Sequence, residues 1–163
     1  MVLKTDRGKD MGKRSPEDAF FECKMCGNCC KGSGGIIVSP SDLERLSAFL
    51  QLPHEEVIAR YGEYSGKKLK IKTGDDGYCI FFMAGRGCTV HPGKPSICRA
   101  WPFFRGNLVD PDSLEMAKDF CPGIQKDARH EAFAQAGLDY LKREKLLAKD
   151  PSLEANALIM DEV

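Results

Sequence analysis

The sequence predicts an α+β fold in which a short β-hairpin or small sheet accompanies three to four helices. Two observations support this class: several segments repeat apolar residues at helical spacing, and others alternate apolar and polar residues over a few positions. The chain of 163 residues is long enough for one domain. A chain of this size buries roughly 70% of the surface that it exposes when unfolded, so it does not need crosslinks merely to fold.

The expected domain spans residues 19–150. Residues 1–18 are rich in Lys, Asp and Gly and have almost nothing to bury, so we expect a disordered N-terminal segment there. Residues 151–163 begin with a proline and are expected to form a loose C-terminal tail.

The first half of the domain is expected to form one strand and two helices. Residues 35–39, GIIVS, are typical of a short strand. The next helix is expected to begin with Ser39 as its cap and Pro40 at its first position. A second helix is expected to begin at Pro53. The first helix has an apolar face made of Leu43, Leu46, Phe49 and Leu50.

The second half combines a hairpin, a proline-rich loop and the longest helix. Residues 67–82 alternate lysine with aliphatic residues, turn at Gly74–Gly77 and continue in an aromatic strand, which predicts a β-hairpin. Residues 87–104 are expected to form a loop and a short helix. Residues 113–121 are expected to form a further strand, and residues 125–150 a helix. The positions of this helix that are spaced to face a core are Phe133, Ala136, Tyr140 and Leu147.

Charge and hydropathy exclude several classes of protein. Lys plus Arg and Asp plus Glu both number 24, so no net charge draws the chain to nucleic acid or to a membrane. The N-terminus lacks the apolar stretch of a secretory signal, and no apolar run approaches the ~20 residues of a membrane span. We therefore expect a soluble, cytoplasmic protein. Four lysines could suggest RNA binding, but a lysine-protected sheet edge explains them at least as well: Lys67, Lys68, Lys70 and Lys72.

Eight cysteines are the strongest functional signal. In a reducing cytoplasm, clustered thiols are more often metal ligands or redox groups than disulfides. Cys23, Cys26 and Cys29 follow the spacing C-x2-C-x2-C, which supplies three ligands of a bacterial-type 4Fe–4S cluster. The partner cysteine of such a cluster comes from elsewhere and precedes a proline, as Cys121 precedes Pro122. Zinc is the alternative, although structural zinc more often uses two separated C-x2-C pairs.

Cys30 directly follows Cys29 and breaks the three-residue step. Neighbouring residues of an extended loop point in opposite directions, so this pair is better placed to serve two centres than to hold one ion. Cys30 would then join Cys79, Cys88 and Cys98 in a second set of four. The alternative is a single centre with spare buried thiols, because free cysteine packs as a small hydrophobe.

Side chains between the cysteines could shape the site. Arg99 follows Cys98 and could bind the cofactor, by offsetting thiolate charge and donating hydrogen bonds to sulfur, or could be an ordinary surface arginine. His91 is a further candidate ligand, although the thiols suffice without it. Five aromatic residues could form an apolar shell that limits water around a cluster, or simply belong to the core: Phe81, Phe82, Trp101, Phe103 and Phe104.

Four ordered blocks, FECKMCGNCC, GYCIFF, GCTVHPGKPSICRAWPF and FCPGI, resemble the CxxCxxCC family of zinc- or iron-chelating proteins, the YkgJ-type cysteine-cluster proteins. Where this family usually has a tyrosine and an arginine, the chain has His91 and Lys94. Lysine keeps the charge but lacks the planar donor fork of arginine. The resemblance implies that all eight cysteines are metal ligands: Cys23, Cys26, Cys29, Cys30, Cys79, Cys88, Cys98 and Cys121.

These observations favour a small protein whose cysteine-rich core is organised by metal. The expected cofactor is one or two iron–sulfur clusters, of the 4Fe–4S type, used for electron transfer or for redox support of a protein partner. The alternative is a structural zinc module that acts through a protein–protein interface. No identifiable substrate pocket or acid–base pair favours a stand-alone enzyme.

Overall fold

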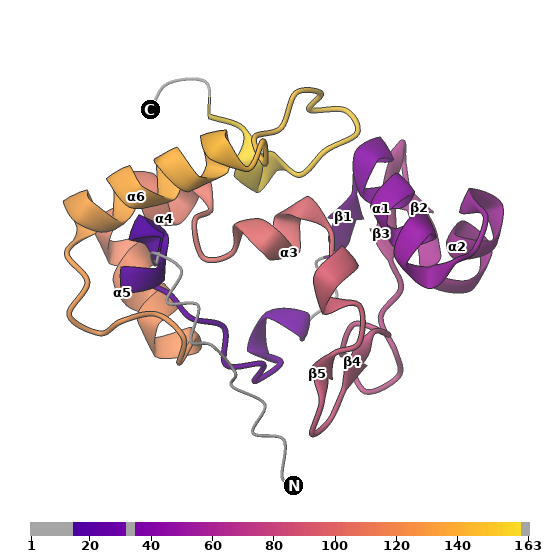
Figure 1. Ribbon diagram of the computed structural model, residues 1–163, viewed down its shortest axis with the longest axis horizontal. Helices are drawn as coiled ribbons and strands as arrows, with labels where there is room; N and C mark the ends of the chain where they lie inside the picture. The colour runs from indigo at the N-terminus through magenta and orange to yellow at the C-terminus, as the bar shows by residue number, and fades with distance from the viewer. Residues whose placement is uncertain (1–14, 32–34, 161–163) are drawn as a thin grey trace, which may run out of the picture.

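A computed structural model of the protein describes residues 15–31 and 35–160, and it confirms the α+β class (Figure 1). Within these residues there are six α-helices, two of them only five residues long, where the sequence suggested three to four. The helices are α1 (Pro40–Leu50), α2 (His54–Tyr61), α3 (Ser96–Ala100), α4 (Arg105–Val109), α5 (Pro111–Phe120) and α6 (His130–Arg143). The strands are β1 (Ile36–Val38), β2 (Gly62–Ser65), β3 (Lys68–Ile71), β4 (Phe82–Met83) and β5 (Gly87–Cys88). Four short 3-10 helices are η1 (Pro16–Ala19), η2 (Asn28–Cys30), η3 (His91–Gly93) and η4 (Asn156–Leu158).

The three-stranded sheet has the order β1-β3-β2, and both pairings are antiparallel. Ile71 of β3 lies opposite Ile36 on one side and Gly62 on the other, so β3 is the central strand. The lysine-rich strand is therefore not a sheet edge, and that explanation of its lysines is wrong. Two of these lysines donate hydrogen bonds instead: Lys68 Nζ to Asn156 Oδ1 at 3.1 Å and Lys72 Nζ to the Ala59 carbonyl at 3.0 Å.

The hairpin expected over residues 67–82 is only partly present. Its turn forms, because the Gly74 N–H donates to the Tyr78 carbonyl at 2.8 Å and Thr73 bridges to Cys79. Beyond the turn, the chain leaves β3, whose two sides are already paired. The aromatic segment instead forms β4, which pairs with β5 as a separate two-stranded sheet.

Helix α1 begins as its sequence predicts. The Ser39 side chain accepts a hydrogen bond from the Asp42 N–H, and the Asp42 carboxylate accepts one from the Ser39 N–H. This reciprocal capping box, with Pro40 at the first helical position, satisfies backbone donors that a helix start leaves free. Helix α2 follows directly after Pro53, also as predicted.

The strand expected over residues 113–121 is wrong, because this segment forms α5. Asp110 caps the helix by accepting from the Asp112 N–H, and Pro111 occupies the first position. The buried residues Leu114 and Ala117 are three positions apart, a helical rather than an alternating spacing. Cys121 is the first residue after α5 and has an extended backbone.

Helix α6 is shorter at both ends than residues 125–150. It ends at Arg143, and Lys145 has a left-handed backbone with φ of 56°. Phe133 and Ala136 are buried as expected, whereas Tyr140 is half-buried. Leu147 is also half-buried, but it lies beyond the end of the helix.

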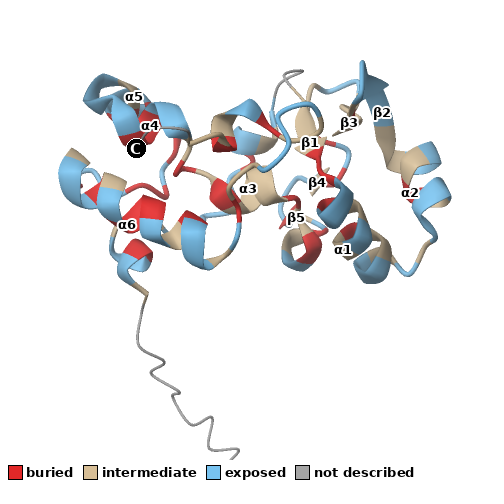
Figure 2. Cartoon of the chain, turned by 90° about the horizontal axis from the view of Figure 1, so that it is seen from above, coloured by how far each residue is buried: buried red, intermediate tan, exposed pale blue. Residues whose placement is uncertain are grey.

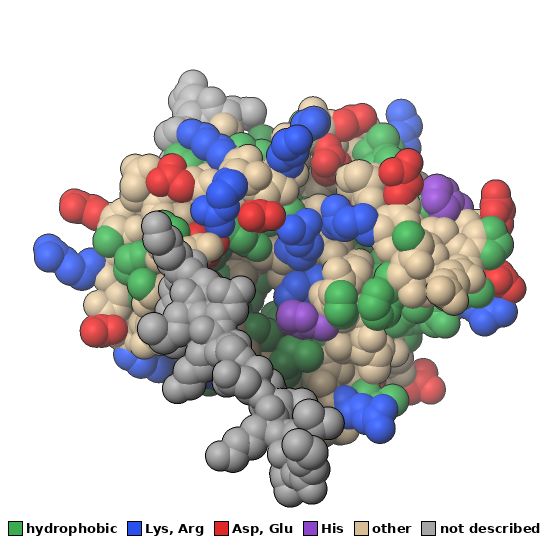
Figure 3. All heavy atoms as spheres, viewed as in Figure 1, with side chains coloured by type: hydrophobic (Ala, Val, Ile, Leu, Met, Phe, Trp, Pro, Cys, Tyr) green, Lys and Arg blue, Asp and Glu red, His purple; other side chains and the backbone are tan. Residues whose placement is uncertain are grey.

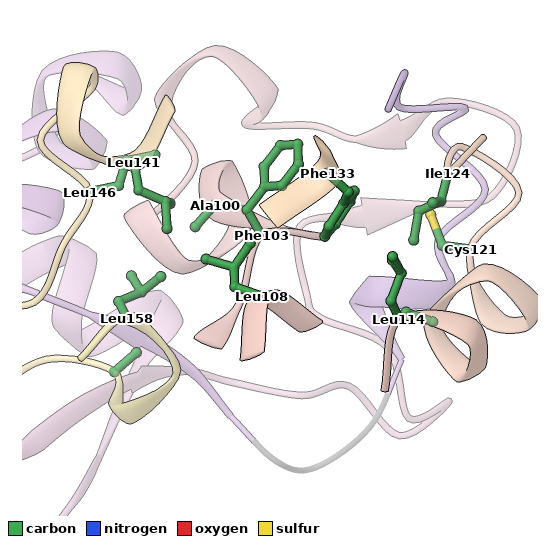
Figure 4. Packing of buried hydrophobic residues seen from close by; sticks show 12 residues of the cluster. Ala100, Phe103, Leu108, Leu114, Cys121, Ile124, Phe133, Leu141, Leu146 and Leu158 are labelled. Carbon is green, nitrogen blue, oxygen red and sulfur yellow. The ribbon is translucent and has the colours of Figure 1, made fainter. Parts of the chain in front are cut away.

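The structure has two hydrophobic cores, one among the helices α3–α6 and the other around the three-stranded sheet (Figures 1 and 2). The first is built by α3–α6 and the C-terminal segment, and it includes Phe103, Phe133 and Cys121 (Figure 4). The second is built by β1, β3, α1 and α2, and it includes Leu46 and Cys79. Helix α3 contacts β1 as well as η4, so it joins the two groups of elements.

Parts of the chain ends take up structure that was not expected. Within the segment predicted to be a loose tail, Ala155 and Leu158 are buried in the first core. In the segment predicted to be disordered, Ser15 precedes η1 and residues 16–18 belong to it. Residues 1–14 and 161–163 lie outside the described part of the chain. Among the described helices, none has the length and apolar character needed to cross a membrane.

Candidate metal centre

All eight cysteines line a single cavity of about 890 Å³. The cavity lies between the two cores, because its walls include Cys121 of the first and Cys79 of the second. Figure 3 shows the molecule hollowed at the centre of one face, with hydrophobic side chains inside the hollow and a histidine and basic side chains at its edge. The fold therefore gathers, around one space, thiols that are spread over 99 positions of the sequence, from Cys23 to Cys121.

Backbone pairing brings the first cysteine block beside Cys121. Phe21 forms a β-bridge with Ile124, and the Glu22 N–H donates to the Gly123 carbonyl at 2.9 Å. A second contact comes from within the cysteine block, where Asn28 Nδ2 donates a hydrogen bond to the Phe120 carbonyl at 2.8 Å. The segment with the C-x2-C-x2-C spacing is thus held against the residues that flank Cys121.

Each of the first two cysteines receives a backbone hydrogen bond on its sulfur. The Met25 N–H lies 3.4 Å from Cys23 Sγ, and the Asn28 N–H lies 3.5 Å from Cys26 Sγ. Left-handed residues accompany both turns, with φ of 55° at Met25 and 83° at Gly27. Backbone hydrogen bonds of this kind orient sulfur ligands around a thiolate-bound metal.

Gly27 is also required by packing. A Cβ at this position would lie 2.4 Å from the ring of Phe82, so a larger residue would push the cysteine loop away from β4.

A second set of thiols is joined by other backbone contacts. The Cys79 N–H donates to the Cys30 carbonyl at 2.7 Å, and Lys31 bridges to Tyr78. Cys88 lies opposite Phe82 in the β4–β5 pair. Burial is the main cause that raises the pKa of the Cys79 and Cys88 thiols. The charge of Cys88 raises the pKa of Cys79 further, and the charges of Cys29 and Cys23 do the same for Cys88.

The adjacent pair does not have the geometry expected of an extended loop. Cys29 and Cys30 belong to η2, and neighbours on a 3-10 helix are a third of a turn apart rather than on opposite sides. A hydrogen bond from the Cys30 thiol is the main cause that lowers the pKa of Cys29 to about 6, and the charge of Lys94 contributes. The same hydrogen bond raises the pKa of Cys30.

Cys98 is placed by α3, whose start is fixed from α1. Asp42, only 1% exposed, accepts hydrogen bonds at Oδ1 from the Ser96 N–H at 2.9 Å and from the Ser96 hydroxyl at 2.7 Å. Arg45 pairs with the same oxygen at 2.5 Å. The sequence identified Ser39 as the helix cap but not Asp42 as its partner. The signal for Asp42 was present, because an acidic residue three positions after a capping serine is typical of a capping box. Burial raises the pKa of Cys98 itself.

The cavity wall also contains Arg99 and aromatic side chains. All five aromatic residues named from the sequence line the cavity. Arg99 also lines it, but its Nη2 lies 3.3 Å from Glu144 Oε2, so the guanidinium already has an acidic partner. Its backbone carbonyl accepts from the Tyr140 hydroxyl at 2.9 Å.

The thiols surround the cavity without converging on one point. Within residues 15–31 and 35–160, no three side chains of His, Cys, Asp or Glu lie close enough together to hold one ion. The donor set itself suits soft metals, because thiolates select zinc, copper(I) and iron–sulfur clusters over the hard cations that oxygen ligands bind. The residues present therefore fit a thiolate-bound group, and binding of it would draw the loops inward.

Comparison with known proteins agrees with this site. The family model "CxxCxxCC: Putative zinc- or iron-chelating domain" matches residues 22–122. An uncharacterized protein of Methanocaldococcus jannaschii is 29% identical over 84 residues, which is 51% of this chain. The match covers 44% of that relative, so the chain aligns with less than half of its length. No solved structure matches.

Proposed function

Because this chain belongs to the CxxCxxCC family, we propose that its eight cysteines ligate metal and that the bound group is iron–sulfur, used for electron transfer or for redox support of a protein partner. The observation that carries the proposal is the single cavity lined by every cysteine of the chain. The cavity can accommodate either kind of thiolate-bound group, and the C-x2-C-x2-C spacing together with the remote Cys121–Pro122 pair favours an iron–sulfur cluster over zinc.

The thiols divide into two proposed ligand sets. One contains Cys121 and the three cysteines of the C-x2-C-x2-C run, which the Phe21–Ile124 bridge brings together. The other contains Cys30, Cys79, Cys88 and Cys98, supported by the hydrogen bond from the Cys79 N–H to the Cys30 carbonyl. An iron–sulfur cluster, when bound, accepts and donates single electrons.

The chain supplies three things to such a group. Backbone N–H groups of Met25 and Asn28 hydrogen-bond to the sulfurs of Cys23 and Cys26, which orients these ligands and would tune a cluster potential. The aromatic wall limits water around the group, which lowers the local dielectric and also tunes the potential. Arg99 is proposed to contribute positive charge from the cavity wall, where Glu144 orients it.

The test is metal and acid-labile sulfide analysis of protein purified without oxygen from iron-replete cells. We expect iron and sulfide in comparable amounts, and a broad thiolate-to-iron absorption band that bleaches on reduction. A variant with Cys23 and Cys26 both changed to serine is the control, and it should lose part of the band. Colourless protein with stoichiometric zinc and no sulfide would replace this proposal with the structural zinc module.

A further inference from the structure

A lysine–histidine pair lies at the cavity beside the thiols. Lys94 Nζ lies 3.1 Å from His91 Nε2, and both residues line the cavity together with Cys29, Cys88 and Cys98. The contact between them shows that the two side chains form one local arrangement at the cavity.

We propose that Lys94, held in place by His91, is the cation that balances the negative charge of the thiolate-bound group. This inference rests on the proposed metal binding, but not on the metal being iron. A divalent ion bound by four thiolates leaves a net negative charge on the group. A positive charge beside a partly buried anionic group stabilises it far more than the same charge would in bulk water.

The other basic side chain expected to act here already has a partner. Arg99 is paired with Glu144, and Glu144 in turn is contacted by Arg143. Lys94, by contrast, forms no ion pair with any carboxylate in the described part of the chain. Its charge therefore remains available to the thiols, whereas Arg99 shares its charge with Glu144.

The electrostatic environment of the thiols agrees with this placement. Burial raises the pKa of Cys88 and Cys98, and the charge of Lys94 acts on both in the opposite direction. Lys94 also contributes to the lowered pKa of Cys29. Lys94 thus shares one cavity with three thiols that come from three separate segments of the chain.

His91 positions the lysine. Burial first, and then the charge of Lys94, lower the pKa of His91, so the ring is neutral at neutral pH and its Nε2 lone pair accepts a hydrogen bond from the ammonium group. The backbone is fixed as well, because Arg45 Nη2 donates to the Lys94 carbonyl at 3.4 Å. A side chain held at both its backbone and its tip gives up less conformational freedom when it acts on a bound group.

The test is a charge series at position 94: Lys94→Arg, Lys94→Gln and Lys94→Glu. Cobalt(II) is the probe, because its thiolate charge-transfer absorption reports binding to metal-free protein in competition with a chelator. We expect Lys94→Arg to bind cobalt nearly as tightly as wild type, Lys94→Gln roughly tenfold more weakly, and Lys94→Glu more weakly still. Lys67→Gln, which removes an exposed lysine outside the cavity, should leave cobalt affinity unchanged.

If Lys94 had a purely structural role, the cobalt affinities of the three variants would not follow the charge at position 94. His91→Ala should weaken cobalt binding in the same direction, and by less than Lys94→Gln. Equal affinities across the Lys94 series, with all variants folded by circular dichroism, would overturn the inference. Wild-type protein that carries no native metal and binds no cobalt would refute metal binding itself. Native zinc, with cobalt affinities that still follow the charge at position 94, would refute only the iron–sulfur assignment.

Discussion

Cys29 and Cys30 are neighbours in sequence, but their backbones lead to different parts of the cavity. The carbonyl of Cys30 is bound by the Cys79 N–H, which ties it to the second core. Cys29 belongs to the block that Asn28 holds against the residue preceding Cys121. Adjacent thiols a third of a turn apart on η2 can each take part in a different ligand set.

This arrangement predicts that Cys29→Ser and Cys30→Ser each remove roughly half of the bound metal, and that the double variant retains almost none. Serine is close to cysteine in size but is a much poorer ligand for soft metals, so the loss of a ligand should far exceed the loss of packing. The measurement is metal per chain together with the absorption spectrum of each variant.

Thr73→Ser is the matched control for these substitutions. Thr73 lines the same cavity but carries no thiol, so this variant should keep its full metal content. If Cys30→Ser also keeps full metal and an unchanged spectrum, then Cys30 is a packed thiol and the protein has one centre.

At the scale of single residues, the sequence indicated the thiols better than their surroundings. Cysteine spacing and the Cys-Pro pair are local patterns, so they can be read without a structure. The contact of Lys94 with His91, by contrast, could be linked to the site only once the structure placed both residues in the cavity wall. Asp42 bonds to Ser96, 54 positions away, and no local pattern indicates that contact.

Among the elements, α3 depends most on support from elsewhere. It has five residues, too few for a stable isolated helix, and its Pro95 cap provides no side-chain hydrogen bond. Asp42 of α1 provides the missing cap, because its carboxylate accepts a hydrogen bond from the Ser96 N–H at the start of α3. The position of Cys98 in the cavity wall therefore depends on a carboxylate from a different helix.

Replacing Asp42 with alanine should loosen α3 and lower the stability of the protein. The change leaves the N–H groups of Ser39 and Ser96 without their acceptor, at a cost of about 1–3 kcal/mol for each buried group left unsatisfied. The measurement is amide hydrogen exchange of residues 96–100, which should become faster, together with a lower urea midpoint at equal metal content.

Glu44→Ala provides the comparison on the same helix. Glu44 is exposed on α1, so its removal should leave both the exchange of α3 and the urea midpoint close to wild type. Unchanged protection of residues 96–100 in the Asp42 variant would show that α3 is held by its apolar contacts alone.

Local patterns predicted the type of most elements but not their partners. The alternation in β3 correctly indicated a strand, yet its place between β1 and β2 depends on segments on both sides of it in the sequence. In α5 the helix signals were present, with Asp110 and Pro111 at its start and Leu114 and Ala117 buried, but the segment was short enough to resemble a strand.

For the whole molecule, the cavity between two cores makes metal a link between two halves of the fold. Each core contributes a cysteine to the cavity wall, Cys121 from the first and Cys79 from the second, and residues 23–30 supply four more. The described thiols do not converge on one point, so a bound group has to draw these segments inward. Metal should consequently stabilise the junction more than either core.

Removing the metal with a chelator should therefore loosen residues 22–31 and 85–106 while α6 persists. Metal–thiolate bonds contribute on the order of 10–16 kcal/mol of apparent binding free energy in structural zinc sites, and that free energy is available to order the loops that hold the ligands. Helix α6 packs through Phe133 and Leu141, both 0% exposed, and contributes no cysteine to the cavity. Amide hydrogen exchange of the loaded and the stripped protein measures the effect, with the amides of α6 as the internal control. Exchange that is equally slow in both states over residues 22–106 would mean that packing alone orders the cysteine loops and that metal has no part in the fold.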